Sequence, residues 1–481
     1  MTETNVQARD DLYIAGQWVS ASGTGRIEMV SPSTEQLAYS VPEATEAEID
    51  TAVAGARRVF EAGTWSALPP AERAGYLFRF AEALSEQADT LTVTLANEMG
   101  APVGTAREVQ ATAGLAQFFA AHAEKVQWEE TRSGAFRPSV VDRLPVGVVA
   151  AVVPWNSPLF LLMQKVAPAL LAGCPVIIKP APETSYSAYA IAEALDAAGL
   201  PAGLVSLVPA GRERAEYLVS HPGIDKISFT GSTATGRRLG VIAAEQFKRI
   251  GLELGGKSAG IVLPDADFGE SMAAIVNGTT INSGQACSLL SRILVPRARR
   301  DEFIQVFCDA LDQLVVGDAL DPATTLGPIV SQRQYDRVMD YIELGVKEGA
   351  TIVRGGVRPA GADRGYLIEP TVFVDADNQM RLAREEIFGP VISVIDYDGL
   401  DEAVSIANDS SYGLSGAVFG PDPEAALAVA RRMRTGSVTI NTSIDFDFDA
   451  PYGGFKSSGI ERELGGTEGI LGFTEARAIG L

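Results

Sequence analysis

The sequence predicts an α/β protein with two α/β domains, the first built on a doubly wound, mostly parallel sheet. From residue 146 to about 254, short β-branched strands alternate with longer helical stretches, which is typical of parallel βαβ units. A second set of the same kind runs from about 268 to 441. A chain of 481 residues also exceeds the size of a single hydrophobic core. Residues 45–123 are alanine-rich and mostly helical, and we expect them to pack against the first sheet.

The first set opens with a buried strand at 146–153, a continuous apolar run that ends at Pro154. Apolar spacing predicts a helix at 159–171, and an alanine-rich helix at 186–198 is closed by Gly199 and Pro201. Further strands are expected at 176–178, 204–208, 224–229 and 249–254, with helices at about 212–219 and 233–246.

The second set has the same alternation, and no low-complexity linker separates it from the first. We expect helices around 299–314, 331–348, 401–408 and 422–434 and strands around 292–295, 391–395, 414–419 and 437–440. The glycine-rich stretch 451–459 predicts a long loop near the end of the chain.

Polar or glycine-bearing segments directly follow four of the expected strands. Ligands of parallel sheets bind at the carboxyl ends of the strands. We therefore expect a binding site that includes Pro154-Trp155-Asn156, Lys179-Pro180, Thr230-Gly231-Ser232 and Gly255-Gly256.

Composition excludes several classes of function. The net charge of −22 repels nucleic acids and anionic membrane surfaces, so neither is expected as a partner. The first residues lack the basic start and apolar stretch of a signal peptide, and three cysteines make no disulfide framework, so a cytoplasmic location is expected. With only His122 and His221 in the chain, histidine-dependent catalysis and histidine-rich metal sites are disfavoured, and no metal is expected.

One of the three cysteines lies in an unusual setting. Cys174 and Cys308 lie in apolar stretches, as buried structural thiols usually do. Cys287 instead lies in the polar segment Asn282-Ser283-Gly284-Gln285-Ala286-Cys287-Ser288. From this context alone, a nucleophile and an inert structural thiol are about equally plausible.

A carboxylate ends the last strand of the first set. The segment 251–258 matches the pattern of a phosphate-binding P-loop, but Leu252-Glu253-Leu254 continues a strand and would bring a carboxylate toward phosphates, so that interpretation is disfavoured. Glu253 is then either an ion-pair partner or a general base, next to glycines that allow close backbone approach.

Six short motifs together resemble the NAD(P)-dependent aldehyde dehydrogenase superfamily, in its order and approximate spacing. The resemblance extends from about Ile14 to the C-terminus. The motifs are Pro154-Trp155-Asn156-Ser157-Pro158, Phe229-Thr230-Gly231-Ser232-Thr233, Glu253-Leu254-Gly255-Gly256-Lys257-Ser258, Gly284-Gln285-Ala286-Cys287, Glu386-Ile387-Phe388-Gly389-Pro390 and Pro451-Tyr452-Gly453-Gly454-Phe455-Lys456-Ser457-Ser458-Gly459.

The resemblance implies an aldehyde dehydrogenase-like fold of three parts. Residues 1–124 and 146–255 would form a Rossmann-type cofactor domain, and residues 256–455 a second α/β, catalytic domain. Residues 125–145 and 456–481 would form a small β oligomerisation arm and a C-terminal tail that adds a strand beside a partner's sheet. The resemblance also implies assembly as a homodimer or a homotetramer, which we expect here.

The resemblance also implies roles for individual residues. Cys287 would be the nucleophile, and Asn156 with the backbone N–H of Cys287 would hold the oxyanion of the thiohemiacetal. Glu253 would activate the water that hydrolyses the thioester, with Lys165 in support. The cofactor would be NAD, with NADP possible, bound by Trp155, Lys179, Gly231, Ser232, Glu386 and Phe388.

Two departures from the family's pattern affect specificity. Pro182 stands where NAD-preferring members often have a glutamate that repels a 2′-phosphate, with Glu183 one position later. Ser157 stands where many members have an aromatic residue, which widens one wall of the expected substrate tunnel. That tunnel is expected to be lined by Ser157, Phe160, Leu161, Gln164, Ile281, Ala286, Ser288, Phe446 and Tyr452, among which no basic residue could bind a substrate carboxylate.

We therefore expect oxidation of a hydrophobic aldehyde, whether aliphatic, terpenoid or aromatic, to its carboxylic acid. The alternative is a non-catalytic structural homologue of the same fold. The presence of Cys287, Glu253 and Asn156 together argues against this alternative, because a structural protein needs none of them.

Overall fold

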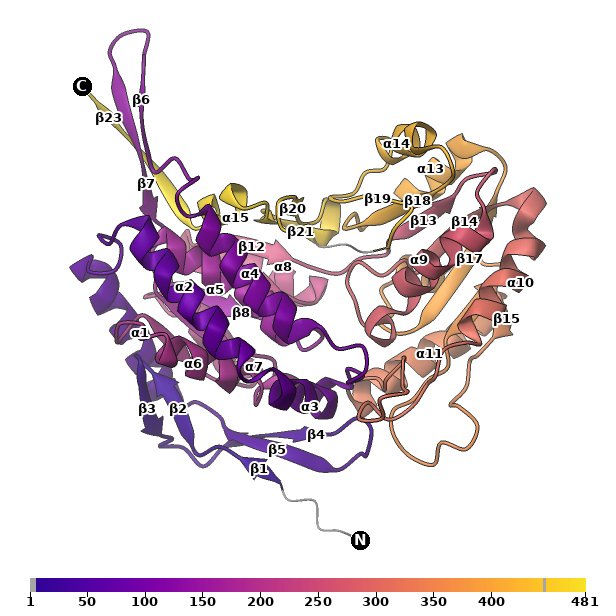
Figure 1. The fold of residues 1–481 in the computed structure, drawn as a ribbon, viewed down its shortest axis with the longest axis horizontal. Helices are drawn as coiled ribbons and strands as arrows, with labels where there is room; N and C mark the ends of the chain where they lie inside the picture. The colour runs from indigo at the N-terminus through magenta and orange to yellow at the C-terminus, as the bar shows by residue number, and fades with distance from the viewer. Residues whose placement is uncertain (1–5, 444–446) are drawn as a thin grey trace.

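Two large sheets, each covered by helices, form the body of the molecule in the computed structural model (Figure 1). The structure describes residues 6–443 and 447–481. Five parallel strands form the centre of the first, eight-stranded sheet, whose order is β21-β12-β11-β8-β9-β10-β2-β3. They are β8 (Val149–Val152), β9 (Val176–Lys179), β10 (Val205–Leu207), β11 (Lys226–Thr230) and β12 (Arg249–Glu253). The expected doubly wound sheet is present.

Both edges of the first sheet are formed by strands that the sequence analysis did not predict. At one edge, β2 (Asp11–Ile14) and β3 (Gln17–Ser20) form an antiparallel hairpin that pairs with β10. At the other edge, β21 (Gly459–Ile460) pairs antiparallel with β12. The expected long loop at 451–459 is therefore wrong: this stretch contains β20 (Pro451–Tyr452) and the 3₁₀ turn η4 (Lys456–Ser458), and at Gly459 it enters β21. Such short pairings lack the periodicity that predicts a strand.

Alternate residues of the central strands pack into different cores. Val149 and Ala151 of β8 face one core, whereas Ala150 and Val152 face the other, as expected for side chains that alternate across a strand. The first core includes α2 (Pro70–Ser85), α3 (Ala88–Met99), α4 (Glu108–His122), α5 (Pro158–Ala172) and α6 (Ala188–Ala197). The second includes α1 (Glu46–Ala62), α7 (Arg212–Ser220) and α8 (Thr233–Gln246). The helical segment 45–123 thus covers both faces.

The second large sheet has seven strands in the order β15-β16-β17-β14-β13-β18-β19, and only β15 runs antiparallel to its neighbour. Its strands are β13 (Ala259–Val262), β14 (Arg292–Pro296), β15 (Thr351–Arg354), β16 (Thr371–Val374), β17 (Val391–Tyr397), β18 (Gly416–Phe419) and β19 (Thr439–Ile440). The helices of this second set are α9 (Phe268–Thr280), α10 (Arg300–Leu311), α11 (Gln332–Glu348), α12 (Arg381–Arg384), α13 (Leu400–Asn408) and α14 (Pro423–Ala430). It also contains the 3₁₀ turns η2 (Ile281–Gly284) and η3 (Arg297–Arg299), whereas η1 (Pro182–Thr184) belongs to the first set.

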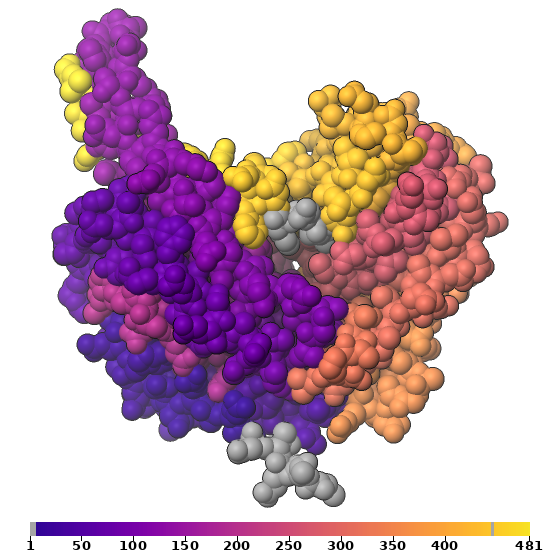
Figure 2. All heavy atoms as spheres, viewed as in Figure 1, coloured from indigo at the N-terminus to yellow at the C-terminus, as the bar shows by residue number. Residues whose placement is uncertain are grey.

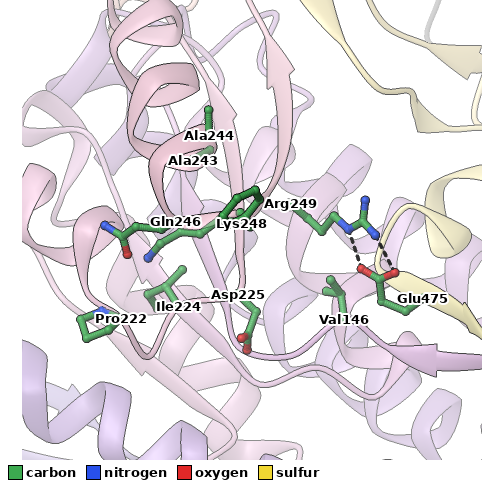
Figure 3. Close-up of a pocket in the computed structure, with 11 residues that line it drawn as sticks. Val146, Pro222, Ile224, Asp225, Ala243, Ala244, Gln246, Lys248, Arg249 and Glu475 are labelled. Atoms are coloured by element: carbon green, nitrogen blue, oxygen red, sulfur yellow. Dashed lines mark hydrogen bonds and ion pairs between the residues drawn. The ribbon is translucent and has the colours of Figure 1, made fainter.

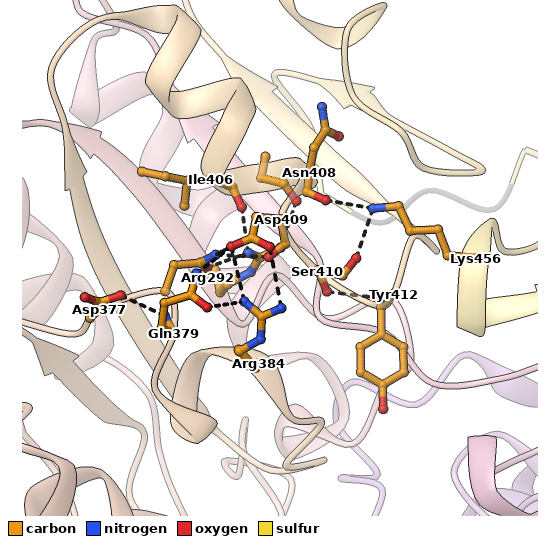
Figure 4. A network of polar contacts seen from close by, with 12 residues as sticks. Arg292, Asp377, Gln379, Arg384, Ile406, Asn408, Asp409, Ser410, Tyr412 and Lys456 are labelled. Carbon is orange, nitrogen blue, oxygen red and sulfur yellow. Dashed lines mark hydrogen bonds and ion pairs between the residues drawn. The ribbon is translucent and has the colours of Figure 1, made fainter.

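A buried arginine joins the second sheet to the segment that enters it from the first. The Arg292 guanidinium donates to the carbonyls of Lys257, Ile406 and Ala407 and to Asn378 Oδ1, at distances from 2.8 to 3.1 Å. Burial lowers its pKa to about 10. Figure 4 shows the surrounding polar network, which includes the ion pair between Arg384 and Asp409. Lys257 directly follows the Gly255-Gly256 segment, so this network fixes the connection between the two sheets.

An arm projects from the body of the molecule (Figures 1 and 2). It consists of β6 (Glu129–Arg132), β7 (Ser139–Pro145) and β23 (Thr474–Gly480), with β7 in the centre. The predicted strand arm at 125–145 is present. The tail forms β23, an edge strand that pairs with β7 of its own chain. Its expected pairing beside a partner's sheet stays a prediction. Within the chain, β23 covers an edge of β7 that would otherwise be exposed.

The remaining elements are short. A three-stranded sheet contains β1 (Gln7–Ala8), β4 (Arg26–Val30) and β5 (Leu37–Pro42). Near the C-terminus, β22 (Glu463–Leu464) pairs with β20 and is followed by α15 (Thr467–Leu471). Within residues 6–443 and 447–481, no helix has the length and apolar character needed to cross a bilayer. The same residues contain no group of three or more His, Cys, Asp or Glu side chains that could hold a metal ion.

Candidate functional site

A cleft of about 1110 Å³ lies between the carboxyl ends of the first sheet and helix α11 of the second set. Its lining brings together residues that the sequence analysis predicted from five different motifs: Trp155, Asn156, Gly231, Ser232, Glu253, Cys287, Glu386 and Phe388. Glu253 is the last residue of β12 and Thr230 the last of β11. The site thus lies where ligands of parallel sheets bind.

Two glycines allow the motif loops to approach one another. A Cβ atom at Gly256 would lie 2.2 Å from the Cys287 carbonyl oxygen, and one at Gly255 would lie 2.3 Å from a carboxylate oxygen of Glu386. A side chain at Gly256 would overlap backbone, and one at Gly255 would displace the Glu386 carboxylate. These glycines let the end of β12 meet the cysteine loop on one side and Glu386 on the other.

The cysteine loop is strained and firmly anchored. Asn282, Ser283 and Gly284 have φ values of 50°, 56° and 77°, so two residues with side chains adopt the left-handed region. Left-handed backbone costs roughly 1–2 kcal/mol per residue with a side chain, and the surroundings must offset it. The buried Gln285 side chain does so in part: its amide donates to Asn282 O at 3.1 Å and its carbonyl accepts from Val330 N at 2.9 Å. This loop ends at Cys287.

Asn156 is bound to the same loop. Its side-chain amide donates to Gln285 O at 3.0 Å, and its backbone carbonyl accepts from the Asn282 amide at 2.7 Å. The backbone N–H of Cys287 donates to no acceptor among the described residues. Asn156 is therefore held against the loop that carries Cys287, and both residues line the cleft.

The Cys287 thiol and the Glu253 carboxyl perturb each other's ionisation. Burial, followed by the charge of Glu253, raises the pKa of Cys287 well above its usual value. Burial, followed by the charge of Glu463, raises the pKa of Glu253 well above its usual value, and Lys165 acts in the opposite direction. Glu253 is only 2% exposed, and the Cys287 thiol is the group that interacts with its carboxyl by hydrogen bonding. Tyr452 Oη lies 3.8 Å from the Cys287 Sγ atom.

Behind Glu253, a completely buried lysine forms an ion pair. Lys165, on α5, is 0% exposed and binds Glu463, whose second carboxylate oxygen has no partner within the described residues. Glu463 was not predicted from the sequence. It lies 298 positions after Lys165, and no local spacing relates the two residues. Its strand β22 pairs with β20, which carries Tyr452, and this pairing brings Glu463 to the site.

Aromatic and apolar residues lie beside α5. Phe160, Leu161 and Gln164 are buried on this helix, and the Phe160 ring lies 6.0 Å from that of Phe448. Phe448 in turn contacts Phe118 of α4 at 5.5 Å, and the sequence analysis missed both. Of the other expected tunnel residues, Ser288 and Tyr452 are buried, Ser157, Ile281 and Ala286 are partly exposed, and Phe446 lies outside the described residues.

The opposite part of the cleft has features that fit a dinucleotide. Ser232 caps the 14-residue helix α8, and residues of its first turn line the cleft, so a helix N-terminus faces the space where a pyrophosphate would bind. Glu386 accepts from Gly256 N at 3.0 Å, and burial raises its pKa to about 7. The rings of Trp155 and Phe388 meet edge-on, 5.3 Å apart.

Lys179 lies at the end of β9 and is influenced by a carboxylate. Burial lowers its pKa to about 8, and the charge of Glu183 opposes this shift. Glu183 also accepts from Arg333 of α11 at 3.3 Å. The Arg333 side chain lines the cleft and is 84% exposed. Arg333 reaches Glu183 from a helix of the second set, 150 positions away, so no local spacing in the sequence indicates this contact.

A second hollow, of about 860 Å³, contains none of the predicted site residues. It is lined by Asp225, Lys248, Arg249 and Glu475 among others, with the last two forming an ion pair (Figure 3). Lys226 and Arg249 begin β11 and β12, so this hollow lies at the amino ends of the strands. The cleft that contains Cys287 is therefore the candidate site.

Comparison with known proteins identifies the family. Residues 18–479 match the family described as the aldehyde dehydrogenase family. The chain belongs to the aldehyde dehydrogenase family. A geranial dehydrogenase from Castellaniella defragrans is 44% identical over 457 residues, which cover 94% of this chain and 95% of the relative. A 3-succinoylsemialdehyde-pyridine dehydrogenase from Pseudomonas is 41% identical over 473 residues, with 98% of each chain covered.

Solved aldehyde dehydrogenases have the same fold. The Mycobacterium tuberculosis enzyme, complexed with NAD⁺, superposes with a TM-score of 0.97 at 44% identity and 99% coverage of each chain. A mutant aldehyde dehydrogenase C from Pseudomonas syringae, complexed with NAD⁺ and octanal, gives a TM-score of 0.94 at 38% identity, covering 100% of this chain and 97% of that one. The predicted family, fold class and enzyme class are confirmed, as is NAD as the cofactor class of the family. The boundaries of the three domains stay a prediction.

The raised pKa of Cys287 predicts the pH dependence of its alkylation in the absence of cofactor. Only the thiolate reacts, so modification by iodoacetamide should keep rising from about pH 7 to about pH 9.5, without levelling off. In Glu253→Gln, the loss of a neighbouring negative charge should shift the curve to lower pH. Peptide mass mapping at each pH measures the rate at Cys287. A plateau below about pH 8 in the wild-type protein would contradict the electrostatics described here.

Proposed function

We propose that this aldehyde dehydrogenase oxidises a hydrophobic aldehyde to its carboxylic acid with NAD, using Cys287 as the nucleophile. The observation that carries the proposal is the convergence of Cys287, Glu253 and Asn156 from three separate motifs at one end of the cleft. NAD supplies a hydride acceptor when bound. Residues from Gly231 to Ala234, with Glu386 and Phe388, would hold it.

The first half of the reaction forms a covalent bond between Cys287 and the substrate. The sulfur adds to the aldehyde carbon as its proton passes to water in the cleft, which is the one proton released overall, and the carbonyl oxygen becomes an oxyanion. The Asn156 amide and the Cys287 backbone N–H stabilise this charge, and losing one such donor typically costs about 100-fold or more in rate. Collapse of the thiohemiacetal with loss of hydride to NAD leaves a thioester on Cys287.

The second half requires a base. Water attacks the thioester carbon, Glu253 accepts a proton from that water, and the carboxylic acid leaves as the Cys287 thiol is restored. A carboxyl whose pKa is raised by burial is a stronger base than an exposed glutamate. The buried Lys165–Glu463 pair lies next to it and supports transfer of this proton. Overall, aldehyde, NAD⁺ and water give acid, NADH and one proton.

The substrate class follows from the residues near α5. Phe160, Phe448 and Phe118 form a continuous aromatic cluster, and among the described residues no arginine or lysine stands at an expected tunnel position. Such a surface suits an aliphatic, terpenoid or aromatic chain. The similar proteins include a geranial dehydrogenase and an enzyme solved with octanal, which supports a hydrophobic aldehyde here.

We also propose a homo-oligomer, either a dimer or a tetramer, in the cytoplasm. The arm of β6, β7 and β23 leaves the body and carries Phe136, whose side chain is fully exposed. A small three-stranded sheet that projects from the body needs a hydrophobic face packed against other structure to be stable, which supports contact with another subunit. All three cysteines are free, as expected for a reducing compartment.

The central test is turnover of an aldehyde panel by wild-type protein and two cysteine variants. NADH formation should be most efficient with aliphatic, terpenoid and aromatic aldehydes and poor with amino-aldehydes. Cys287→Ser should abolish it while NAD⁺ binding persists, because the dinucleotide is held by other residues. Cys308→Ser, a change of the same kind on α10, should retain activity. Substantial turnover by Cys287→Ser would reject the mechanism, and a wild-type protein inactive on every aldehyde would favour a non-catalytic homologue.

A second prediction concerns NAD and NADP, where we expect NAD to be favoured and NADP to bind as well. Glu183 opposes a 2′-phosphate near Lys179, and Arg333 partly neutralises it. Glu183→Gln should raise NADP⁺ affinity and Arg333→Ala should lower it, each by up to roughly fivefold because exposed charges are screened, with little change for NAD⁺. Equilibrium dissociation constants measure both. Equal changes for the two cofactors would place this ion pair outside the 2′ position.

A further inference from the structure

Helix α5 carries Phe160, Leu161, Gln164 and Lys165, but its first turn has no cap of its own. The N-cap residue Ser157 has φ −154° and ψ 66°, and its hydroxyl accepts from none of the helix amides. The next residue, Pro158, has no N–H. The amides of the following residues are buried and must find an acceptor elsewhere, since an unpaired buried N–H is costly.

Glu108 supplies this acceptor from another helix. One of its carboxylate oxygens accepts from Leu159 N at 2.8 Å and from Phe160 N at 3.3 Å. The Ser157 side chain interacts with the same carboxyl. Glu108 is itself the first residue of α4, which also lacks a side-chain cap. Its carboxyl therefore stands at the N-terminal ends of two packed helices, where the helix dipoles favour a negative charge.

The capped turn is directly connected to Asn156. Only Ser157 separates Asn156 from the first residue of α5, and β8 ends at Val152 on the other side. On the side of the cysteine loop, Asn156 is held by Gln285 and Asn282. On the helix side, Glu108 holds the turn. The direction of the Asn156 amide relative to Cys287 thus depends on anchors at both sides.

We propose that Glu108 is a positioning residue for the oxidation: by holding the first turn of α5, it keeps Asn156 and Ser157 aligned with Cys287. The inference rests on the proposed function, because it acts through the proposed oxyanion donor Asn156. It concerns the rate of the chemical step rather than the binding of the dinucleotide, whose expected ligands lie on other segments.

The chain contains a matched control for this capping contact. Glu98 of α3 accepts from Tyr186 N at 2.7 Å and Ser187 N at 3.2 Å, the two residues directly before α6, and so holds the start of that helix by a similar contact. Helix α6 carries none of the predicted site residues. Burial raises the pKa of Glu108 to about 7 and that of Glu98 to about 8, so a large fraction of each carboxyl is protonated near pH 7. A glutamine, whose carbonyl accepts equally well, should replace either one.

The experiment compares Glu108→Ala, Glu108→Gln and Glu98→Ala in rapid-mixing measurements of the first turnover, at saturating NAD⁺ and octanal. We expect Glu108→Ala to form NADH roughly tenfold more slowly, because small misplacements of reacting groups are costly. Glu108→Gln should stay within about twofold of wild type. Glu98→Ala should lose thermal stability as Glu108→Ala does, but keep the wild-type rate.

The same measurements in an Asn156→Ala background separate positioning from general destabilisation. There, Glu108→Ala should slow the first turnover little further, because the donor it positions is absent. The proposal is overturned if Glu108→Ala keeps the wild-type rate, or if Glu98→Ala slows the reaction equally. If Asn156→Ala itself has no effect, the proposed function fails instead. Should Glu108→Ala not fold, Glu108→Asp replaces it, with slowing expected because the shorter side chain withdraws from Leu159 N, and an unchanged rate overturning the proposal.

Discussion

The partly exposed Cys287 thiol and the buried Glu253 carboxyl both line the cleft, and the poor solvation of these two groups is the constraint on which the rest of the site depends. Burial raises the pKa of each well above its usual value, so each group holds its proton more tightly than it would in water. The surroundings must then stabilise charge only where the reaction creates it. The Asn156 amide and the Cys287 N–H can meet an oxyanion, and the Lys165–Glu463 pair lies where a proton accepted by Glu253 can be passed on. Each of these groups is fixed by packing before any substrate enters.

That arrangement requires two sheets to meet at one edge. The carboxyl ends of the first sheet contribute Asn156 and Glu253, whereas Cys287 and Glu386 follow elements of the second set. The Gly255-Gly256 segment leaves no room for side chains between them. The hydrogen bonds from Arg292 to Lys257 O then fix this segment to the second sheet. The Gly255-Gly256 segment therefore holds the two sheets together at the cleft.

The alternation of strands and helices along the chain and the short motifs predicted those parts of the structure that depend on neighbouring residues. The alternation of strands and helices at 146–254 predicted the five central strands of the first sheet, and the motifs predicted which loops meet at the cleft. The misses are long-range contacts: β21 is recognisable only by the strand it joins, and Glu463, Arg333 and Glu108 reach their partners from distant positions in the chain. Nothing in the spacing of Glu108 indicates that it caps a helix starting 50 residues later, because capping depends on how the helices pack.

The most direct test of the site that Cys287 and Glu253 share is the mass of the protein after reaction with an aldehyde and NAD⁺ when Glu253 is replaced by glutamine. The amide cannot accept a proton from water, so the reaction should stop after the hydride has left. Intact-protein and peptide mass spectrometry should then show one acyl group on Cys287, formed together with a burst of NADH. A Glu253→Gln protein that produces the burst but carries no acyl group, or carries it on another residue, would contradict the account.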